Sequence, residues 1–259
     1  SQTRIGLKTF PDCVNSHRDF PVDCFEVAIR PVIFGKETSL EDQLQAYEPI
    51  KDKVVGIHGS IYREGVNFLD PQARSANILA LDYCNQASSF FPHLNYILFH
   101  PGHLIANSAC SFEHFFSFVS QHSIEKLHFE FEPFFSYSDR LVFPLHQVNE
   151  WIAFQQRHQH PMILDTAHCF ITCNALGYDF YSYFAALTKA FNPSTIHIST
   201  TDLSDKGFND KHLHLADGAI DFERLLPSLL NRTLILEIND VNFTDINYLR
   251  NLLHLQPTS

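Results

Sequence analysis

The stretch Ile163-Leu-Asp-Thr-Ala-His-Cys-Phe170 decides how the rest of the chain is interpreted. It begins as a short apolar run and continues with Asp165 and His168, three residues apart. An aliphatic run that ends in a carboxylate is typical of a buried parallel strand, which presents that carboxylate at its C-terminal end. His168 then falls on the first turn beyond the strand. We therefore expect both side chains to face one cleft.

Five further strand-like segments also end in a histidine or an acidic residue. These segments are Gly56–His58, Leu98–His100, His128–Glu132, Ile196–His197 and Leu236–Glu237. A lone histidine at a strand end is usually a packed structural residue, and many of the 16 histidines must be of that kind, including His158 and His160. Six strands that end alike instead predict convergence on one metal site with several ions.

The composition is that of a globular protein. The chain has 259 residues, a hydrophobic fraction of 45% and a mean hydropathy of -0.11. That length suits one barrel domain, which we expect to cover residues 1–259. The six cysteines form no Cys-x-x-Cys pair, and no apolar run of about 18 residues is present. These features predict free thiols in the reducing cytoplasm and no membrane association.

The net charge of -11 argues against broad electrostatic binding to nucleic acid, which depends on Lys and Arg meeting phosphates. Bound metal would weaken that argument. Three divalent ions would bring the net charge to about -5 and would concentrate positive charge in the cleft. The overall charge therefore does not identify the substrate.

Eight strand-like segments alternate with helical patterns along most of the chain. The strands are expected at Arg4–Thr9, Cys24–Ile29, Val54–His58, Tyr96–His100, Leu127–Glu132, Met162–Asp165, Thr195–Ser199 and Leu234–Ile238. Helices are expected near Asn15–Phe20, Ser39–Ile50, Pro71–Phe90, Ser108–His122, Leu145–Arg157, Tyr178–Phe191, Asp221–Leu230 and Thr244–Leu255. This alternation predicts an α/β fold, a single (β/α)8 TIM barrel, whose active site lies where the strands end.

The segment after the seventh strand adds a second cluster of candidate ligands. Asp210, His212 and His214 alternate along it, so an extended backbone would project all three to one side. Imidazole and carboxylate ligands suit zinc, and carboxylates also suit manganese or magnesium.

Together these motifs resemble the endonuclease IV family, the zinc-dependent apurinic/apyrimidinic endonucleases of the xylose-isomerase-like barrel superfamily. Leu164–His168 resembles the family's Leu-Asp-Thr-x-His element, and Phe99–Gly102 its Phe-His-Pro-Gly turn. Asp210–Gly218 is similar to its Asp-Arg-His-x-His…Glu-Gly loop, and Leu236–Glu237 to its last-strand Leu-Glu. The resemblance extends from about residue 54 to about residue 240.

The resemblance implies nine ligands for three metal ions. The first ion would be held by His58, His100 and Glu130, the second by Glu130, Asp165, His197 and Glu237, and the third by His168, Asp210 and His212. Glu132 shares a strand face with Glu130 and is the alternative fifth-strand ligand. Glu130 is preferred because Pro133 reproduces a Glu-x-x-Pro spacing common in the superfamily.

The implied activity is phosphoester hydrolysis by water activated at a centre of two or three zinc ions. Glu130, Glu237 and His100 would act in catalysis. Tyr62 and Arg63, where the family inserts side chains into DNA, would contact the substrate together with His214, although an ordinary surface loop is the alternative. His103 and His214 could also orient metal ligands.

The chain departs from the family where DNA is recognised. Phe131–Phe135 replaces a polar segment after the fifth strand, and Thr9–Val14 replaces a Gly-rich one. Damaged DNA and a small sugar phosphate are both expected as possible substrates, and these departures favour the small one. The alternative activity is that of a sugar or sugar-phosphate isomerase or epimerase, which needs only the quartet of the second ion. A metal-binding protein without activity is the third reading.

Overall fold

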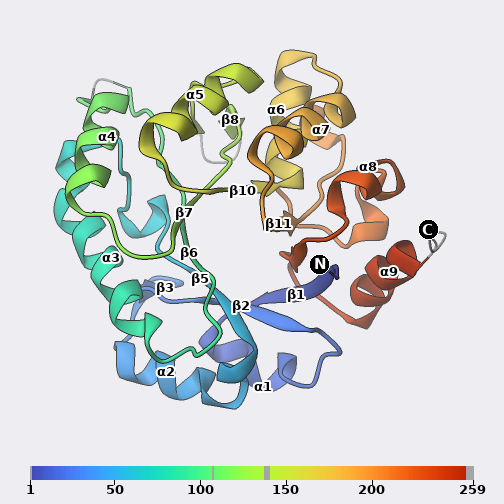
Figure 1. The fold of residues 1–259 in the computed structure, drawn as a ribbon, viewed down its shortest axis with the longest axis horizontal. Helices are drawn as coiled ribbons and strands as arrows, with labels where there is room; N and C mark the ends of the chain where they lie inside the picture. Colours follow the sequence, from blue (N-terminus) through green and yellow to red (C-terminus); the bar gives the residue numbers. More distant parts are fainter. Residues whose placement is uncertain (1, 107, 137–140, 255–259) are drawn as a thin grey trace.

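The computed structural model describes residues 2–106, 108–136 and 141–254, and its eight long strands close into a parallel barrel (Figure 1). The strands are β1 (Arg4–Thr9), β2 (Cys24–Ala28), β5 (Val54–His58), β6 (Tyr96–Phe99), β7 (Leu127–Glu130), β10 (Met162–Asp165), β11 (Thr195–Ile198) and β12 (Thr233–Leu236). Their order around the barrel is β1-β12-β11-β10-β7-β6-β5-β2. The predicted (β/α)8 fold and its eight strands are confirmed.

Helices surround the barrel in Figure 1. They are α1 (Val14–His17), α2 (Leu40–Tyr47), α3 (Arg74–Ser88), α4 (Phe112–Gln121), α5 (Val148–His158), α6 (Thr166–Leu176), α7 (Phe180–Phe191), α8 (Phe222–Leu229) and α9 (Phe243–His254). Short 3-10 helices cover Pro11–Cys13, Glu48–Lys53, Tyr62–Glu64, Pro71–Ala73, Ser204–Gly207 and Leu215–Asp217. The predicted helix end at Leu255 lies outside the described residues. None of the described helices combines the length and apolar character needed to cross a bilayer.

Helix α6 was not predicted, although it carries His168. It follows β10 without a loop, and Asp165 is its N-cap, with Oδ1 accepting a hydrogen bond of 2.8 Å from the backbone N–H of His168. Residues 166–173 are all buried, so the helix is apolar on every side. A helix of that kind has no 3.6-residue polar-to-apolar period and cannot be recognised by amphipathic pattern.

Two short antiparallel hairpins were also missed. They are formed by β3 (Val32–Ile33) with β4 (Lys36–Glu37), and by β8 (Phe135–Ser136) with β9 (Leu141–Val142). Strands of two residues give no detectable alternation.

The barrel interior supports the floor of the site. A small buried cluster fills it, consisting of Cys24, Val55, Tyr96, Leu98, Ile163 and Ile235. A Cβ on Gly56 would lie 2.1 Å from the Tyr96 ring, so only glycine leaves room for this side chain. The Tyr96 hydroxyl then donates a 2.7 Å hydrogen bond to Glu26.

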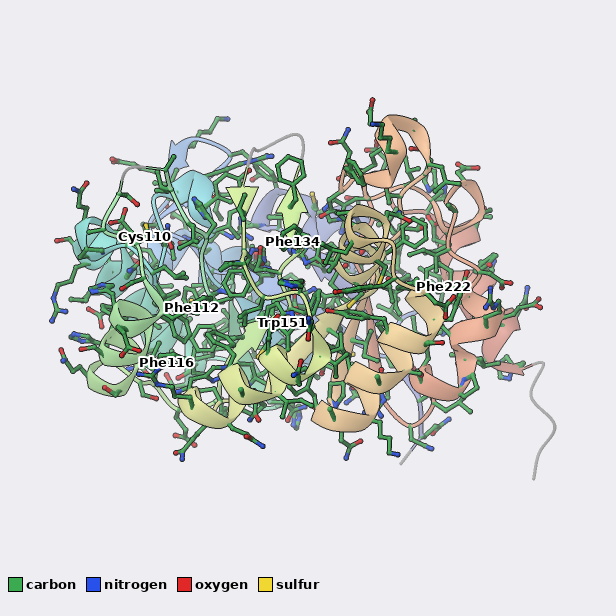
Figure 2. All side chains as sticks on the ribbon, turned by 90° about the horizontal axis from the view of Figure 1, so that it is seen from above. Cys110, Phe112, Phe116, Phe134, Trp151 and Phe222 are labelled. Atoms are coloured by element: carbon green, nitrogen blue, oxygen red, sulfur yellow. The ribbon has the colours of Figure 1, made fainter. Side chains whose placement is uncertain are left out.

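An aromatic layer fills the space outside the strands near α4 and α5. Phe115, Phe118 and Trp151 are almost completely buried, and Figure 2 labels Trp151 with Phe112 and Phe116 in the same part of the molecule. The phenylalanines of α4 therefore belong to the core, as their helical spacing predicts.

Candidate metal centre

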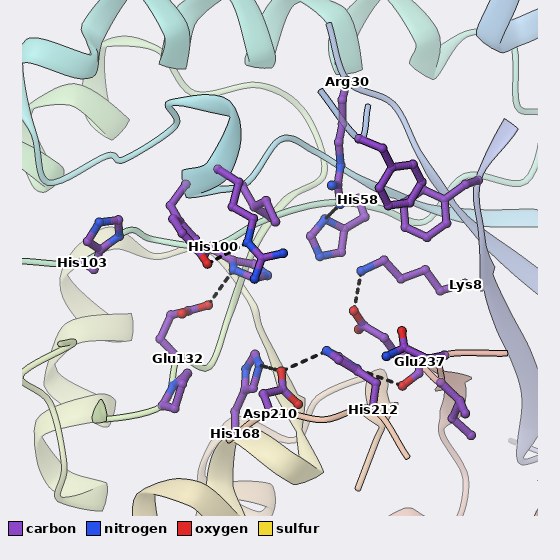
Figure 3. Close-up of a pocket in the computed structure, with 18 of the residues that line it drawn as sticks. Lys8, Arg30, His58, His100, His103, Glu132, His168, Asp210, His212 and Glu237 are labelled. Carbon is purple, nitrogen blue, oxygen red and sulfur yellow. Dashed lines mark hydrogen bonds and ion pairs between the residues drawn. The ribbon is translucent and has the colours of Figure 1, made fainter. Parts of the chain in front are cut away.

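The predicted ligands converge on one cavity of about 420 Å³, formed where the strands end (Figure 3). Its lining includes His58, His100, His168, Asp210, His212 and Glu237. The predicted ligands come from six barrel strands or the residue after them (β5, β6, β7, β10, β11 and β12), from the first turn of α6 and from the segment after β11. They meet because the C-terminal ends of parallel barrel strands open on the same face. These side chains lie together, as the strand-end pattern predicts, and their role as metal ligands stays a prediction.

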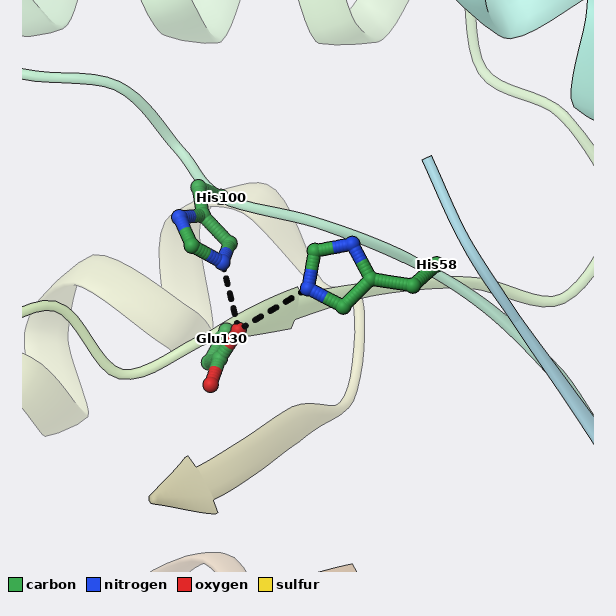
Figure 4. Close-up of side chains that lie close together, drawn as sticks. All are labelled: His58, His100 and Glu130. Atoms are coloured by element: carbon green, nitrogen blue, oxygen red, sulfur yellow. Dashed lines mark ion pairs between the residues drawn. The ribbon is translucent and has the colours of Figure 1, made fainter. Parts of the chain in front are cut away.

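The first cluster joins His58, His100 and Glu130, whose potential ligand atoms all lie within 4.8 Å of one another (Figure 4). Glu130 Oε2 is 2.7 Å from His100 Nε2 and 3.6 Å from His58 Nε2. The structure thus brings Glu130, rather than Glu132, into this cluster.

The second cluster joins Glu130, Asp165, His197 and Glu237, again with ligand atoms within 4.8 Å of one another. His197 Nδ1 lies 3.0 Å from Glu130 Oε1 and 3.0 Å from Glu237 Oε2. Register places Asp165 beside His197 on neighbouring strands. Glu130 belongs to both clusters and turns one oxygen toward each, which is the geometry of a bridging carboxylate.

The third set is centred on Asp210. Its Oδ2 atom lies 3.1 Å from His168 Nε2 and 3.0 Å from His212 Nε2. Among the described residues, the first two clusters have all their ligand atoms within 4.8 Å of one another. The ligand atoms of the Asp210 set are spread more widely. Asp210 nevertheless connects α6 to the segment after β11.

Each of three cavity histidines donates its Nδ1–H to a backbone carbonyl. The acceptors are Gly59 O for His58 at 2.9 Å, Phe131 O for His168 at 2.8 Å and Glu237 O for His212 at 3.1 Å. A carbonyl oxygen can only accept, so Nδ1 carries a proton, and in the neutral imidazole the lone pair of Nε2 faces the cavity. Metal-binding histidines are usually fixed in this way.

The other two histidines have carboxylate partners instead. His100 Nδ1 lies 2.9 Å from Glu132 Oε1, and His197 Nε2 lies 2.8 Å from Glu26 Oε2. In both, the remaining nitrogen faces Glu130. All five imidazoles therefore have an oxygen atom beside the outer nitrogen, here called the outer acceptor, and an inner nitrogen directed at a carboxylate. The outer contact is a hydrogen bond in all but His100, whose contact with Glu132 is an ion pair. This matches the carboxylate–histidine–metal arrangement.

Several inner atoms have no hydrogen-bond partner although they are buried. They include His58 Nε2, Glu130 Oε2 and Asp210 Oδ1. The 2.7 Å separation of Glu130 Oε2 from His100 Nε2 does not have the angles of a hydrogen bond. Buried polar atoms without partners call for a ligand. Carboxylate oxygens and imidazole nitrogens fit a divalent metal ion such as zinc.

Titration behaviour reflects the excess of carboxylates. Burial would raise the pKa of Glu130, but the nearby His197 and His100 lower it well below its usual value. Burial would lower the pKa of His168, but Asp165 and Asp210 raise it well above its usual value. Burial raises the pKa of Asp165 to about 6. Without metal, the cavity therefore compensates its negative charge by binding protons, which metal ions would displace.

The Phe99–Gly102 turn presents His100. Gly102 has φ +114°, and a Cβ there would lie 2.1 Å from Asn67 Oδ1. Asn67 holds the turn by donating a 3.0 Å hydrogen bond to the carbonyl of His103. Glycine is needed because the backbone conformation and the close approach both exclude a side chain.

The residues predicted to contact the substrate do not all lie in the cavity. Tyr62 and Arg63 line the cavity, as does His103, which packs edge-on against Tyr62. His214 does not line it, and its Nδ1 lies 2.9 Å from Asp245 Oδ2 on α9. The expectation that Asp210, His212 and His214 project to one side is therefore wrong for His214. His212 has φ 49°, and this left-handed residue breaks the alternation of an extended chain.

Sequence analysis missed three residues of the site. Lys8 at the end of β1 has its Nζ 2.5 Å from Glu237 Oε1, and Arg30 follows β2. Glu26 is buried under His197 in the middle of β2. The available signal was a charged residue within an apolar strand-like run, for Lys8 and Glu26, or directly after one, for Arg30.

Comparisons with known proteins agree on the fold. Endonuclease IV from Thermus thermophilus superposes with a TM-score of 0.65 at 17% identity, covering 96% of this chain and 97% of that one. The 3-keto-D-glucoside 4-epimerase of E. coli gives 0.63 at 12% identity, covering 96% and 100%. An L-ribulose 3-epimerase gives 0.60 at 14% identity, covering 99% and 88%. No family model and no curated protein matches the sequence.

Proposed function

We propose that this protein is a metal-dependent phosphoester hydrolase that uses two or three zinc ions. The observation that carries the proposal is the set of five cavity histidines, each with an outer acceptor and an inner nitrogen aimed at a carboxylate. Manganese or magnesium could replace zinc where carboxylates dominate the ligand set. The first two clusters could each hold one ion, and the third set would close around another.

The number of ligands favours hydrolysis over isomerisation. A single-ion isomerase needs only the quartet of Glu130, Asp165, His197 and Glu237. The remaining ligands, His58, His100, His168, Asp210 and His212, have no purpose in such a reaction. When bound, two or three divalent ions would lower the pKa of a water molecule and stabilise the charge on the phosphate oxygens.

Three residues would act directly in catalysis. Glu130 would fix the spacing of the first two ions, since its Oε2 faces His100 and its Oε1 faces His197. Glu237 would orient the second ion from the opposite side and is itself held by Lys8. His100, whose Nδ1 lies 2.9 Å from Glu132 Oε1, would present Nε2 to the first ion beside Glu130 and so help to position the ion that polarises the phosphate.

The substrate is proposed to be a phosphoester, either damaged DNA or a small sugar phosphate. The net charge of -11 and the cavity volume of about 420 Å³ support a small ligand or a single displaced nucleotide. Tyr62 and Arg63, on the 3-10 helix after β5, are the proposed substrate contacts at the rim. His214 is a weaker substrate-binding candidate because of its Asp245 partner.

An epimerase is the second candidate, because the Glu130 quartet is one of the two close clusters and two epimerases share the fold. Elemental analysis of protein purified without added metal should find two or three ions per chain. A comparison of abasic-site duplex, bis-p-nitrophenyl phosphate and a panel of ketoses should show phosphodiester cleavage only. One ion per chain together with ketose epimerisation would replace the hydrolase by the epimerase.

A further inference from the structure

Two buried cations lie beside the proposed metal ligands. The side chain of Lys8 is 7% exposed and that of Arg30 is 6% exposed, and both line the cavity (Figure 3). Long cationic side chains are almost never buried this deeply unless anions compensate them. Each forms one ion pair, Lys8 with Glu237 at 2.5 Å and Arg30 with Glu64 at 3.4 Å. Lys8 also lies beside Glu26 on the neighbouring strand, whose carboxylate has His197 and Tyr96 as its hydrogen-bond partners.

Both cations retain hydrogen-bond donors. An ammonium has three N–H donors and a guanidinium has five. Among the described residues, Lys8 Nζ has only Glu237 as an acceptor. The Arg30 side chain has only long polar contacts, 3.4 Å to Glu64 Oε1 and 3.3 Å to His58 Nδ1, and its Nε has no partner.

The protonation of His58 reduces the partners of Arg30 further. His58 Nδ1 donates its proton to Gly59 O, which leaves Nε2 facing Glu130. A protonated Nδ1 cannot also accept a hydrogen bond from Arg30. In the form of the site that can bind metal, Arg30 therefore keeps Glu64 as its single side-chain acceptor among the residues described.

The charge balance points the same way. Three divalent ions would balance the six carboxylates of the site, Glu26, Glu130, Glu132, Asp165, Asp210 and Glu237. Lys8 and Arg30 would then share the carboxylate of Glu64. One of these two buried cations would therefore stay uncompensated until an anion of the substrate binds beside it.

We infer that Lys8 and Arg30 form a second anion subsite beside the metal ligands, which takes a second phosphate group of the substrate. The inference rests on the proposed function and narrows it to substrates with two phosphates, one at the metal centre and one at these cations. The planar fork of Arg30 suits two phosphate oxygens, and Lys8 adds a point charge.

Binding of two nucleotides to the metal-loaded protein tests the subsite. Isothermal titration calorimetry would compare thymidine 5′-monophosphate with thymidine 3′,5′-bisphosphate. The wild type should bind the bisphosphate about tenfold more tightly or better, as expected for an added pair of charge-assisted hydrogen bonds. Lys8→Met and Arg30→Met should each remove most of this preference, whereas Arg30→Lys should keep part of it.

Lys211→Met is the matched control, since Lys211 pairs with Asp202 and does not line the cavity. It should leave the preference unchanged. Equal affinity of the wild type for the two nucleotides, or a preference that survives in both methionine variants, overturns the inference. Loss of metal in Lys8→Met would instead show that Lys8 only holds Glu237, and would remove it from the subsite.

The outcome is separable from that of the proposed function. Hydrolysis of bis-p-nitrophenyl phosphate without a bisphosphate preference would leave the hydrolase standing and remove the subsite. A preference that depends on Lys8 and Arg30 in a protein without hydrolase activity would establish the subsite and remove the hydrolase.

Discussion

Two groups of buried histidines lie in different regions of this barrel. The cavity group at the strand ends has carboxylates on its inner side and an acceptor behind every ring. The second group, His158 at the end of α5 with His160, lies against the aromatic layer, where the His158 ring contacts Phe115, Phe129 and Phe154. His158 Nδ1 accepts a 3.0 Å hydrogen bond from the backbone of His160, and its Nε2 has no partner.

The difference lies in the partners and not in burial, because His158 is 7% exposed and His168 is 6% exposed. Carboxylates raise the pKa of His168 against the effect of burial, whereas burial, followed by the charge of His160, lowers the pKa of His158 to about 3. Neither the number of histidines nor the degree of their burial therefore identifies a metal site. The acid partners and outer acceptors do.

The largest expected effect comes from removing the carboxylate that the two close clusters share. Glu130→Ala should abolish binding of at least one ion and lower kcat/KM for phosphodiester cleavage by about 1,000-fold or more, a loss of about 4 kcal/mol. Elemental analysis and steady-state kinetics measure both. His158→Gln is the matched change in the other histidine group and should keep the metal content of the wild type.

Removing the third ligand set should have the next largest effect. The double variant His168→Ala with Asp210→Ala should lose one ion per chain and about 100-fold or more in activity, with the barrel intact by circular dichroism. Both close clusters retain their ligands in this variant. Unchanged metal content would refute the third site.

Outer acceptors should have a smaller but measurable influence. Glu26→Gln removes the charge behind His197 and should weaken metal affinity or activity about 10- to 100-fold. Glu132→Gln should act similarly through His100. The control is Glu113→Gln, which disrupts only the exposed pair with Arg157. If all three variants bind metal alike, outer acceptors do not distinguish the two histidine groups.

The strands and their ligands could be predicted from the sequence because the signal for each lies within a few consecutive residues. Each barrel strand is a short apolar run, and the ligands His58, Asp165 and Glu237 occupy or directly follow the last position of theirs. Parallel barrel topology then places those ends on one face whatever the loops do. The ligand positions could therefore be predicted although the sequence is only 12–17% identical to the three solved structures compared.

The remaining features depend on tertiary structure or on single backbone angles. Helix α6 has no polar face to reveal it, and the φ of 49° at His212 that turns His214 toward α9 leaves no trace in a His-x-His pattern. The acceptors Gly59 O and Phe131 O are backbone atoms and cannot be recognised by residue type. Glu26 was visible as a charge in an apolar strand, but its partner lies 171 residues away.

The smallest expected effect on activity, none at pH 7, belongs to the second histidine group, which affects stability in acid instead. Folded His158 has its pKa lowered to about 3, against an ordinary value of 6.5, so the unfolded chain binds the additional proton. Stability from this group is therefore complete above about pH 6.5 and is lost as the pH falls toward 3, by up to about 4 kcal/mol. Cavity histidines titrate differently because of their carboxylates, so the comparison requires a variant of His158 alone.

Urea unfolding of wild type and His158→Gln at pH 7 and pH 5, both with a chelator present, isolates this contribution. The wild type should lose more unfolding free energy between the two pH values than the variant, because glutamine cannot take up the proton. Activity at pH 7 should be the same in both proteins, since His158 lies outside the cavity lining. An equal loss of unfolding free energy in the two proteins would mean that His158 has the same pKa in the folded and the unfolded chain. Its aromatic surroundings would then not keep it neutral.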